Sequence, residues 1–130
     1  MAVQVFKLLI FLKRRPGMSL QEFRDYYERV HVKLGEKYMT GVCRYVRRYV
    51  QPVPRPGKGA TDELDFDVVT EVWFENRAIF ESVIQSASRD AMPAEVVADE
   101  ERLFDRSRSR FATVIEVESE LPGRGASHST

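Results

Sequence analysis

Two kinds of apolar pattern alternate along this chain, and their order limits its possible folds more than any other feature. Runs rich in β-branched and aromatic residues are typical of strands, and they occupy residues 5–12, 42–50, 66–74 and 110–118. Helical periodicity follows the first run after Ser19 and the third run at Arg77–Ser88, with further helical turns after Pro93. The order β-α-β-β-α-β predicts an α+β, ferredoxin-like fold, in which an antiparallel four-stranded sheet carries the helices on one face.

Capping and loop signals separate these elements. Ser19 and Glu22 form the S-x-x-E pattern of a capping box at the start of the first helix. Residues 51–63 contain three prolines and two glycines, which predicts a mobile loop at the edge of a pocket or dimer. We expect one domain over residues 1–118 and a disordered tail over residues 119–130, which has almost no side chains to bury.

The composition excludes several classes of partner. Twenty basic and twenty acidic residues cancel, so no overall positive field favours nucleic acid or an anionic membrane surface. Lys7 interrupts the apolar run near the N-terminus, which is also too short to span a bilayer. The single cysteine, Cys43, has no internal disulfide partner, and no histidine or cysteine pair has metal-ligand spacing. We therefore expect a reducing, cytoplasmic setting and no bound metal.

Several strands carry large apolar residues on both faces of the predicted sheet. In the second strand, Val42, Val46 and Val50 alternate with Cys43, Tyr45 and Tyr49. Helices on one face alone would leave the other face as an exposed apolar patch. We therefore predict a homodimer in which two sheets pack face to face. Cys43, in mid-strand without a nearby base, is expected to be an inert buried thiol.

One helix face includes a histidine among apolar residues. Steps of three and four residues define this face, which consists of Phe23, Tyr27, Val30, His31, Leu34 and Tyr38. An imidazole at this position is either a structural group bonded to a backbone carbonyl or a general acid and base in a pocket between helix and sheet. The spacing leaves both interpretations open.

Four segments occur in a characteristic order: FLKRRPGMSLQEFRDYYERVHVKL, RYVRRYV, FDVVTEVWFENRAIFESV and DEERLFDRSRSRFATVIEVE. Together they resemble the EthD family of dimeric α+β barrel proteins, over Lys7 to Glu118. The resemblance implies a homodimer, a pocket between helices and sheet, and no metal or organic cofactor. It also implies chemistry similar to that of olivetolic acid cyclase, methylmuconolactone methylisomerase and the dehydratases of fungal aromatic polyketide pathways. His31 matches the histidine of the family's R-x-Y-Y-x-x-x-H helix, so the resemblance favours a catalytic His31.

The third predicted strand places two carboxylates and a tryptophan on one face. Asp67, Glu71 and Trp73 alternate there with apolar residues. If this face points toward the helices, Asp67 or Glu71 could orient His31 or carry a proton itself. Alternatively, both carboxylates form ion pairs with arginines of the neighbouring strand. The alternation alone does not decide which face points inward.

Aromatic residues are the candidates for substrate binding. The hydroxyls of Tyr27 and Tyr45 could donate to an enol or carbonyl oxygen, and Trp73 could stack on a flat ring. The first functional hypothesis is a cofactor-free lyase, cyclase or isomerase, such as a dehydratase, that acts on a small aromatic or polyketide-derived molecule with His31 as general acid and base. The second is a non-catalytic small-molecule-binding or accessory protein, and a cofactor-free monooxygenase is a third. A ligand-sized cavity where His31 meets another polar side chain favours the first hypothesis.

Overall fold

The computed structural model of the protein describes residues 4–60 and 62–123, and its centre is an antiparallel sheet. The strand order is β2-β3-β1-β4. The four strands are β1 (Phe6–Leu12), β2 (Val42–Tyr49), β3 (Val68–Phe74) and β4 (Arg110–Thr113). The predicted α+β, ferredoxin-like plan is therefore confirmed.

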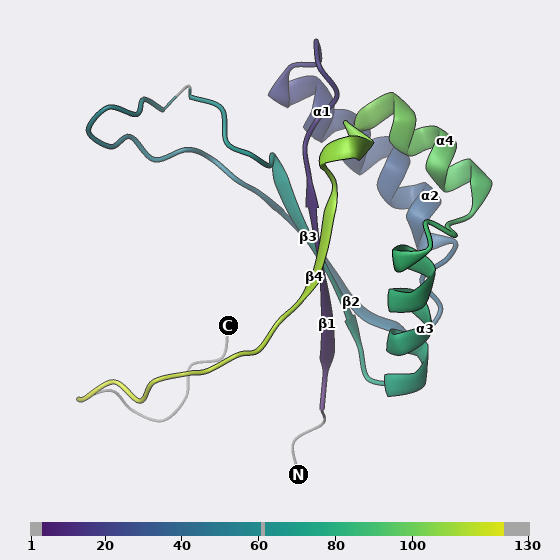
Figure 1. Ribbon diagram of the computed structural model, residues 1–130. Coiled ribbons are helices and arrows are strands. Elements are labelled where there is room, and N and C mark those ends of the chain that lie inside the picture. The colour runs from purple at the N-terminus through teal and green to yellow at the C-terminus, as the bar shows by residue number, and fades with distance from the viewer. Residues whose placement is uncertain (1–3, 61, 124–130) are drawn as a thin grey trace.

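The helices lie on one side of this sheet (Figure 1). A continuous helical segment between β1 and β2 comprises α1 (Leu20–Tyr26), η1 (Tyr27–His31) and α2 (Val32–Glu36), and the segment between β3 and β4 contains α3 (Arg77–Ser88), α4 (Ala94–Leu103) and η2 (Arg106–Arg108). Ser19 and Glu22 form the predicted capping box of α1. No helix in the described part of the chain is long and apolar enough to cross a membrane.

The residues of β3 define the two faces of the sheet. Val68, Thr70, Val72 and Phe74 are buried on the face toward the helices, while Val69, Glu71 and Trp73 lie on the opposite, outer face. The buried side chains pack against helix residues such as Phe23, Tyr27 and Leu103. The apolar core therefore lies between the sheet and the helices.

A bulge in β2 changes the predicted alternation of that strand. Val42 pairs with Phe74 and Arg44 pairs with Trp73, so Cys43 is an extra residue in the ladder. Tyr45 consequently falls on the helix face together with Val42, and the expected sides of this strand are wrong around the bulge. Cys43 itself is exposed, so the expectation of a buried thiol is also wrong for this chain.

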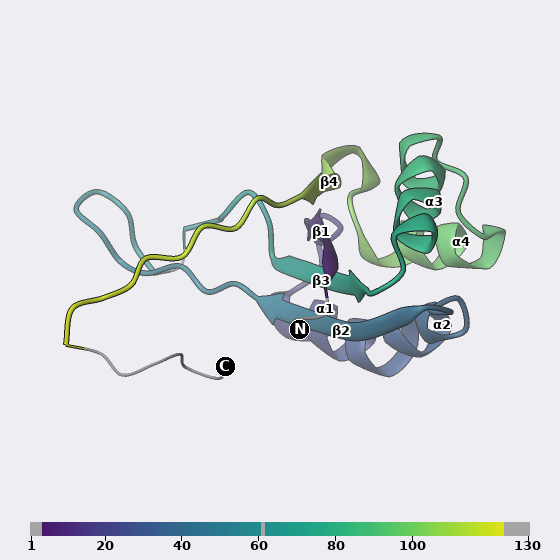
Figure 2. The ribbon, with the colours of Figure 1, turned by 90° about the horizontal axis from the view of Figure 1, so that it is seen from below.

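The outer face carries no helix in the described residues, and two segments project from the sheet on that side. Figure 2 shows the loop between β2 and β3 and the segment after β4 extending away from the helices. The loop contains an isolated bridge between Arg55 and Lys58. β4 ends at Thr113, five residues before the predicted end, and the extended chain beyond it leaves Ile115 and Val117 exposed by 96% and 91%. Part of the predicted tail, residues 124–130, lies outside the described residues.

Candidate active site

A cavity of about 140 Å³ lies between the helix face of the sheet and the helices. Its wall is mainly apolar and includes Leu8, Ile10, Val72, Phe74, Val96 and Phe104. In another protein, an engineered apolar cavity of about 150 Å³ binds benzene. The cavity therefore has room for one small ring, and its wall favours a ring with little polar surface.

The π-helical turn η1 positions His31 on this cavity wall. In an α-helix, Tyr26 and His31 would point about 140° apart, because each residue turns the chain by about 100°. The π turn, in which the N–H of Val32 donates to the carbonyl of Tyr27, brings residues five positions apart closer to alignment. Both Tyr26 and His31 can therefore reach the same side chain, Asp99 of α4.

His31 and Asp99 form a buried pair. The distance between His31 Nδ1 and Asp99 Oδ2 is 2.9 Å, and the two residues are 7% and 2% exposed. The Tyr26 hydroxyl donates to the other carboxylate oxygen of Asp99, and this hydrogen bond, with burial, raises the pKa of Tyr26. The rings of Tyr27 and Phe104 contact the imidazole edge-on, with centroids 5.5 and 5.3 Å from that of His31. The imidazole is thus fixed in position and orientation.

This geometry assigns the His31 proton to Nδ1. An ionised carboxylate only accepts hydrogen bonds, and Arg102 Nη1 lies 3.7 Å from Asp99 Oδ1 as its counter-ion. Nδ1 is therefore the donor, and in the neutral ring Nε2 is left as a proton acceptor. Nε2 makes no hydrogen bond to residues 4–60 or 62–123. An Asp99-oriented imidazole with a free Nε2 has the arrangement of a general base.

Two tyrosine hydroxyls lie on the same cavity wall. The Tyr27 hydroxyl is 2.6 Å from Thr70 Oγ1, in the buried interior, and Tyr45 also lines the cavity. Burial raises the pKa of Tyr27 and of Tyr45 above the ordinary value for a phenol. Both hydroxyls therefore stay protonated and are available as hydrogen-bond donors.

Glu100 is a second acidic residue on the cavity wall. It follows Asp99 on α4, and Arg106 Nε donates to its Oε1 at 3.2 Å. Burial raises the pKa of Glu100, although the charges of His31 and Arg106 act in the opposite direction. The cavity thus contains an imidazole and a carboxyl group whose pKa is raised by burial.

The predicted carboxylates of the third strand lie elsewhere. Asp67 is buried in an ion-pair cluster at the end of β1, where the Arg14 backbone N–H and guanidinium each donate to it at 2.9 Å. Glu71 lies on the outer face and accepts from Arg48 Nε at 2.5 Å, which is the cross-strand ion pair given as the alternative. Neither carboxylate is a hydrogen-bond partner of His31; Asp99 has that place.

Of the three predicted substrate-binding aromatics, Tyr27 and Tyr45 line the cavity and Trp73 does not. Trp73 lies on the outer face, where its Nε1 donates to Glu71 and Lys7 Nζ is 4.1 Å from the ring centroid. It therefore has no access to a ligand in this cavity.

Asp99 and Glu100 are the site residues that the sequence analysis missed. They lie within a charged stretch, DEERLFDRSRSR, which resembles a solvated surface. However, Asp99 lies three residues after Val96 and four before Leu103, both of which are buried. The spacing that identified His31 on its helix also identifies Asp99 as an acid on an apolar face.

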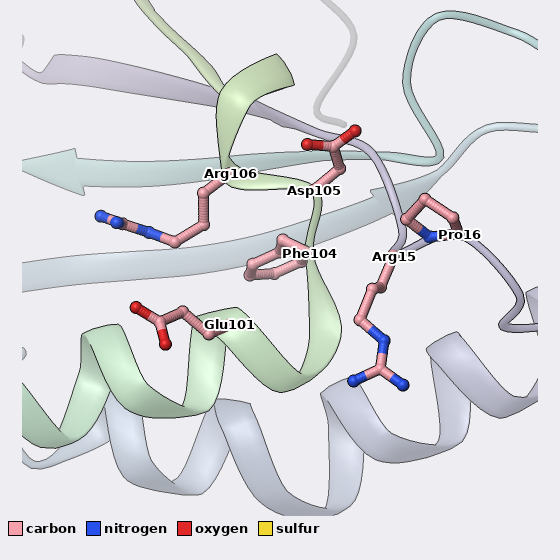
Figure 3. Close-up of a pocket in the computed structure, with 6 residues that line it drawn as sticks. All are labelled: Arg15, Pro16, Glu101, Phe104, Asp105 and Arg106. Carbon is pink, nitrogen blue, oxygen red and sulfur yellow. The ribbon is translucent and has the colours of Figure 1, made fainter.

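A surface depression lies beside the cavity, at the end of α4. Figure 3 shows Arg15 and Arg106 on opposite sides of Phe104, with Glu101 on the helix below. Phe104 lines both the depression and the cavity, so its ring separates the two. The depression carries charges of both signs and has no clear preference for an ionic ligand. In the described residues, no group of three or more histidine, cysteine, aspartate or glutamate side chains is arranged to hold a metal ion.

The fold and site define a small α+β domain of the ferredoxin-like plan with an acid–base pair in an apolar cavity. Residues 15–107 match the EthD domain, and the chain belongs to the EthD family. An ethyl tert-butyl ether D (EthD) family protein from Bacillus halodurans has the same fold, with a TM-score of 0.55 and 16% identity over 86% of this chain and 99% of that one. A point mutant of SnoaB, a cofactor-independent oxygenase from Streptomyces nogalater, aligns with a TM-score of 0.44 and 15% identity over 93% of this chain and 99% of that one. No curated protein matches the chain.

Proposed function

We propose that the protein is a cofactor-free acid–base enzyme, a lyase, cyclase or isomerase that acts on a small aromatic or polyketide-derived molecule. The observation that carries the proposal is the arrangement of His31, which lines a ring-sized cavity and whose Nδ1 is held by Asp99, while Nε2 makes no hydrogen bond to residues 4–60 or 62–123. A merely structural histidine needs no cavity beside its second nitrogen. A general base needs one, because the substrate must reach that atom.

The proposed chemistry is proton removal next to a carbonyl group. His31 Nε2 takes the proton, and the electron pair of the broken C–H bond moves into the enolate. A tyrosine hydroxyl, from Tyr27 or Tyr45, donates to the enolate oxygen and stabilises the developing charge. Asp99 stabilises the imidazolium that forms. Dehydration, aldol cyclisation and double-bond isomerisation all begin with this step.

Deuterium exchange tests this proposal without knowledge of the natural substrate. The protein is incubated in D₂O with a panel of one-ring ketones and β-hydroxyketones, and deuterium at the carbon next to the carbonyl is followed by mass spectrometry. We expect the wild-type protein to catalyse exchange with at least one member. His31→Ala should lose ~10²- to 10⁴-fold in rate, and His31→Gln should not restore it, because an amide cannot exchange the proton.

The control variant is Glu81→Gln, which removes an exposed carboxylate on α3, away from the proposed interface, and should leave the rate unchanged. A folded His31→Ala protein with the wild-type rate would contradict the catalytic role. If the wild-type protein binds ring ketones without catalysing exchange, it is instead a non-catalytic small-molecule-binding protein of the same fold.

We also propose that the protein is a homodimer joined through the outer faces of its sheets. Leu9 and Val46 lie on that face, opposite the helices, and Phe11 packs there against Phe66 with ring centroids 5.3 Å apart. Isolated apolar side chains on a surface are normal, but a contiguous apolar patch is typical of an interface. The exposed segment after β4 projects on the same side (Figure 1), where a second copy would cover it.

A further inference from the structure

Glu100 has features that a purely structural carboxylate does not need. Its side chain lines the cavity together with His31, so the two ionisable groups face the same bound ligand. One carboxyl oxygen, Oε1, accepts from Arg106, while Oε2 makes no hydrogen bond to residues 4–60 or 62–123. Glu100 therefore combines a place on the cavity wall with a carboxyl oxygen that is not engaged by the described residues, as a group that gives or takes a proton requires.

The groups around Glu100 come from two helical elements and one turn. His31 faces it from η1, Arg106 contacts it from η2, and Asp90, beyond the end of α3, contacts Arg106 at 2.6 Å. Asp90 takes up part of the positive charge of Arg106, which reduces the ability of Arg106 to keep Glu100 ionised. Burial then raises the pKa of Glu100. His31 and Glu100 therefore lie in different environments, which suits them to opposite roles in proton transfer.

We propose that Glu100 is a second catalytic residue, the general acid that protonates a leaving hydroxyl group, and that the substrates are small cyclic β-hydroxycarbonyl compounds. This inference rests on the proposed function, because it assigns the base to His31. It narrows the reaction to loss of water.

The proposed step balances without any co-reactant. His31 Nε2 removes the proton from the carbon next to the carbonyl, and the electrons of that C–H bond form the new C=C bond. The C–O bond to the β-hydroxyl breaks, and the oxygen leaves with its electron pair and the Glu100 proton as water. The imidazolium proton then returns to the Glu100 carboxylate through solvent, which restores both groups.

The experiment separates the base from the acid with one probe, 3-hydroxycyclohexanone in D₂O. Deuterium at the carbon between carbonyl and hydroxyl reports the base, and formation of cyclohexenone reports the acid. In Glu100→Gln we expect exchange to continue while water loss falls ~10²- to 10⁴-fold. His31→Ala should lose both signals. The matched control is Glu101→Gln, which changes the next residue of α4 outside the cavity and should keep both.

A second variant distinguishes loss of the general acid from a change in folding. Glu100→Ala should lose water elimination and regain part of it when acetate or formate is added, since a small carboxylic acid can occupy the vacated space. The role of Glu100 would be overturned if Glu100→Gln lost water at the wild-type rate, or if a folded Glu100→Ala protein were not rescued. Either result would leave the role of His31 intact. Unchanged exchange in His31→Ala would instead overturn the proposed function. Exchange without water loss in the wild-type protein would overturn the assignment to β-hydroxycarbonyl substrates.

Discussion

His31 and Asp99 occupy helix positions where apolar side chains normally pack. The hydrogen bond between them reduces the cost of burying either polar group. A buried carboxylate without partners is costly, because burial disfavours its charged form. Asp99 accepts from both His31 and the Tyr26 hydroxyl, which offsets that cost. The arrangement leaves one imidazole nitrogen free to act on a ligand. A polar pair of this kind adds little to stability compared with apolar packing, which favours a functional reason for it.

The sequence identified one member of this pair and not the other. His31 stands out because a lone histidine interrupts an otherwise apolar face, whereas Asp99 is the first of several charged residues in its segment. Asp67 and Glu71 were candidate partners because strand alternation places them on one face. Alternation cannot tell which face is inward, and the structure places Glu71 on the outer side and Asp67 beside Arg14.

At the scale of elements, the order and type of the main helices and strands followed from apolar periodicity, while their irregularities did not. The bulge at Cys43 puts Val42 on the same side of β2 as Tyr45, and it depends on hydrogen bonding to β3 rather than on a local signal. Likewise, apolar residues at three- and four-residue steps do not predict the π turn that aligns His31 with Tyr26. Tertiary contacts decide both features, and both determine which side chains enter the cavity.

The ion-pair cluster at the end of β1 connects the loop between β2 and β3 to the sheet. This cluster predicts that the stability of the protein depends on pH. Glu63 accepts from Arg14 and Lys13 at 2.5 and 2.8 Å, and the hydrogen bond from Arg14 is the main reason that the pKa of Glu63 falls from 4.5 to about 2. The unfolded chain therefore binds this proton more readily than the folded one. The contribution of ionised Glu63 to the free energy of unfolding is complete above pH 4.5 and is lost as the pH falls toward about 2.

Urea unfolding across this pH range checks the prediction. Glu63→Gln should be less stable than the wild-type protein at neutral pH, and the difference should shrink on acidification. The effect is expected to be small, because the Glu63 side chain is 61% exposed and solvent screens the pairs. The exposed Glu75→Gln serves as the control. A constant difference between Glu63→Gln and wild type at all pH values would contradict the account.

At the scale of the whole molecule, the bare outer face and the segment after β4 predict a dimer. Ile115 and Val117 are almost fully exposed in one chain, so replacing both with glutamate should not disturb an isolated protomer. In a dimer that covers this segment, the new charges would be buried and should weaken association. Sedimentation velocity should therefore give twice the mass of one chain for the wild-type protein and a shift toward the monomer for the double variant. An obligate interface buries more than ~1,500 Å² in total.

The control for the dimer is Leu20→Glu, which places the same charge on α1, on the helix side of the sheet. Leu20 is 45% exposed, and this variant should sediment as the wild-type protein does. A wild-type protein that is monomeric at micromolar concentration would contradict the proposed dimer.

The most direct test of the central claim is ¹⁵N NMR of the His31 ring. The chain has only two histidines, so His128→Gln leaves a single imidazole to observe. We predict that neutral His31 carries its proton on Nδ1, that Asp99→Asn changes this tautomer preference, and that a one-ring ketone shifts the Nε2 resonance on binding. A proton on Nε2 in the wild-type protein, or an Nε2 resonance that no ring ketone moves, would contradict the assignment of His31 as the base of this cavity.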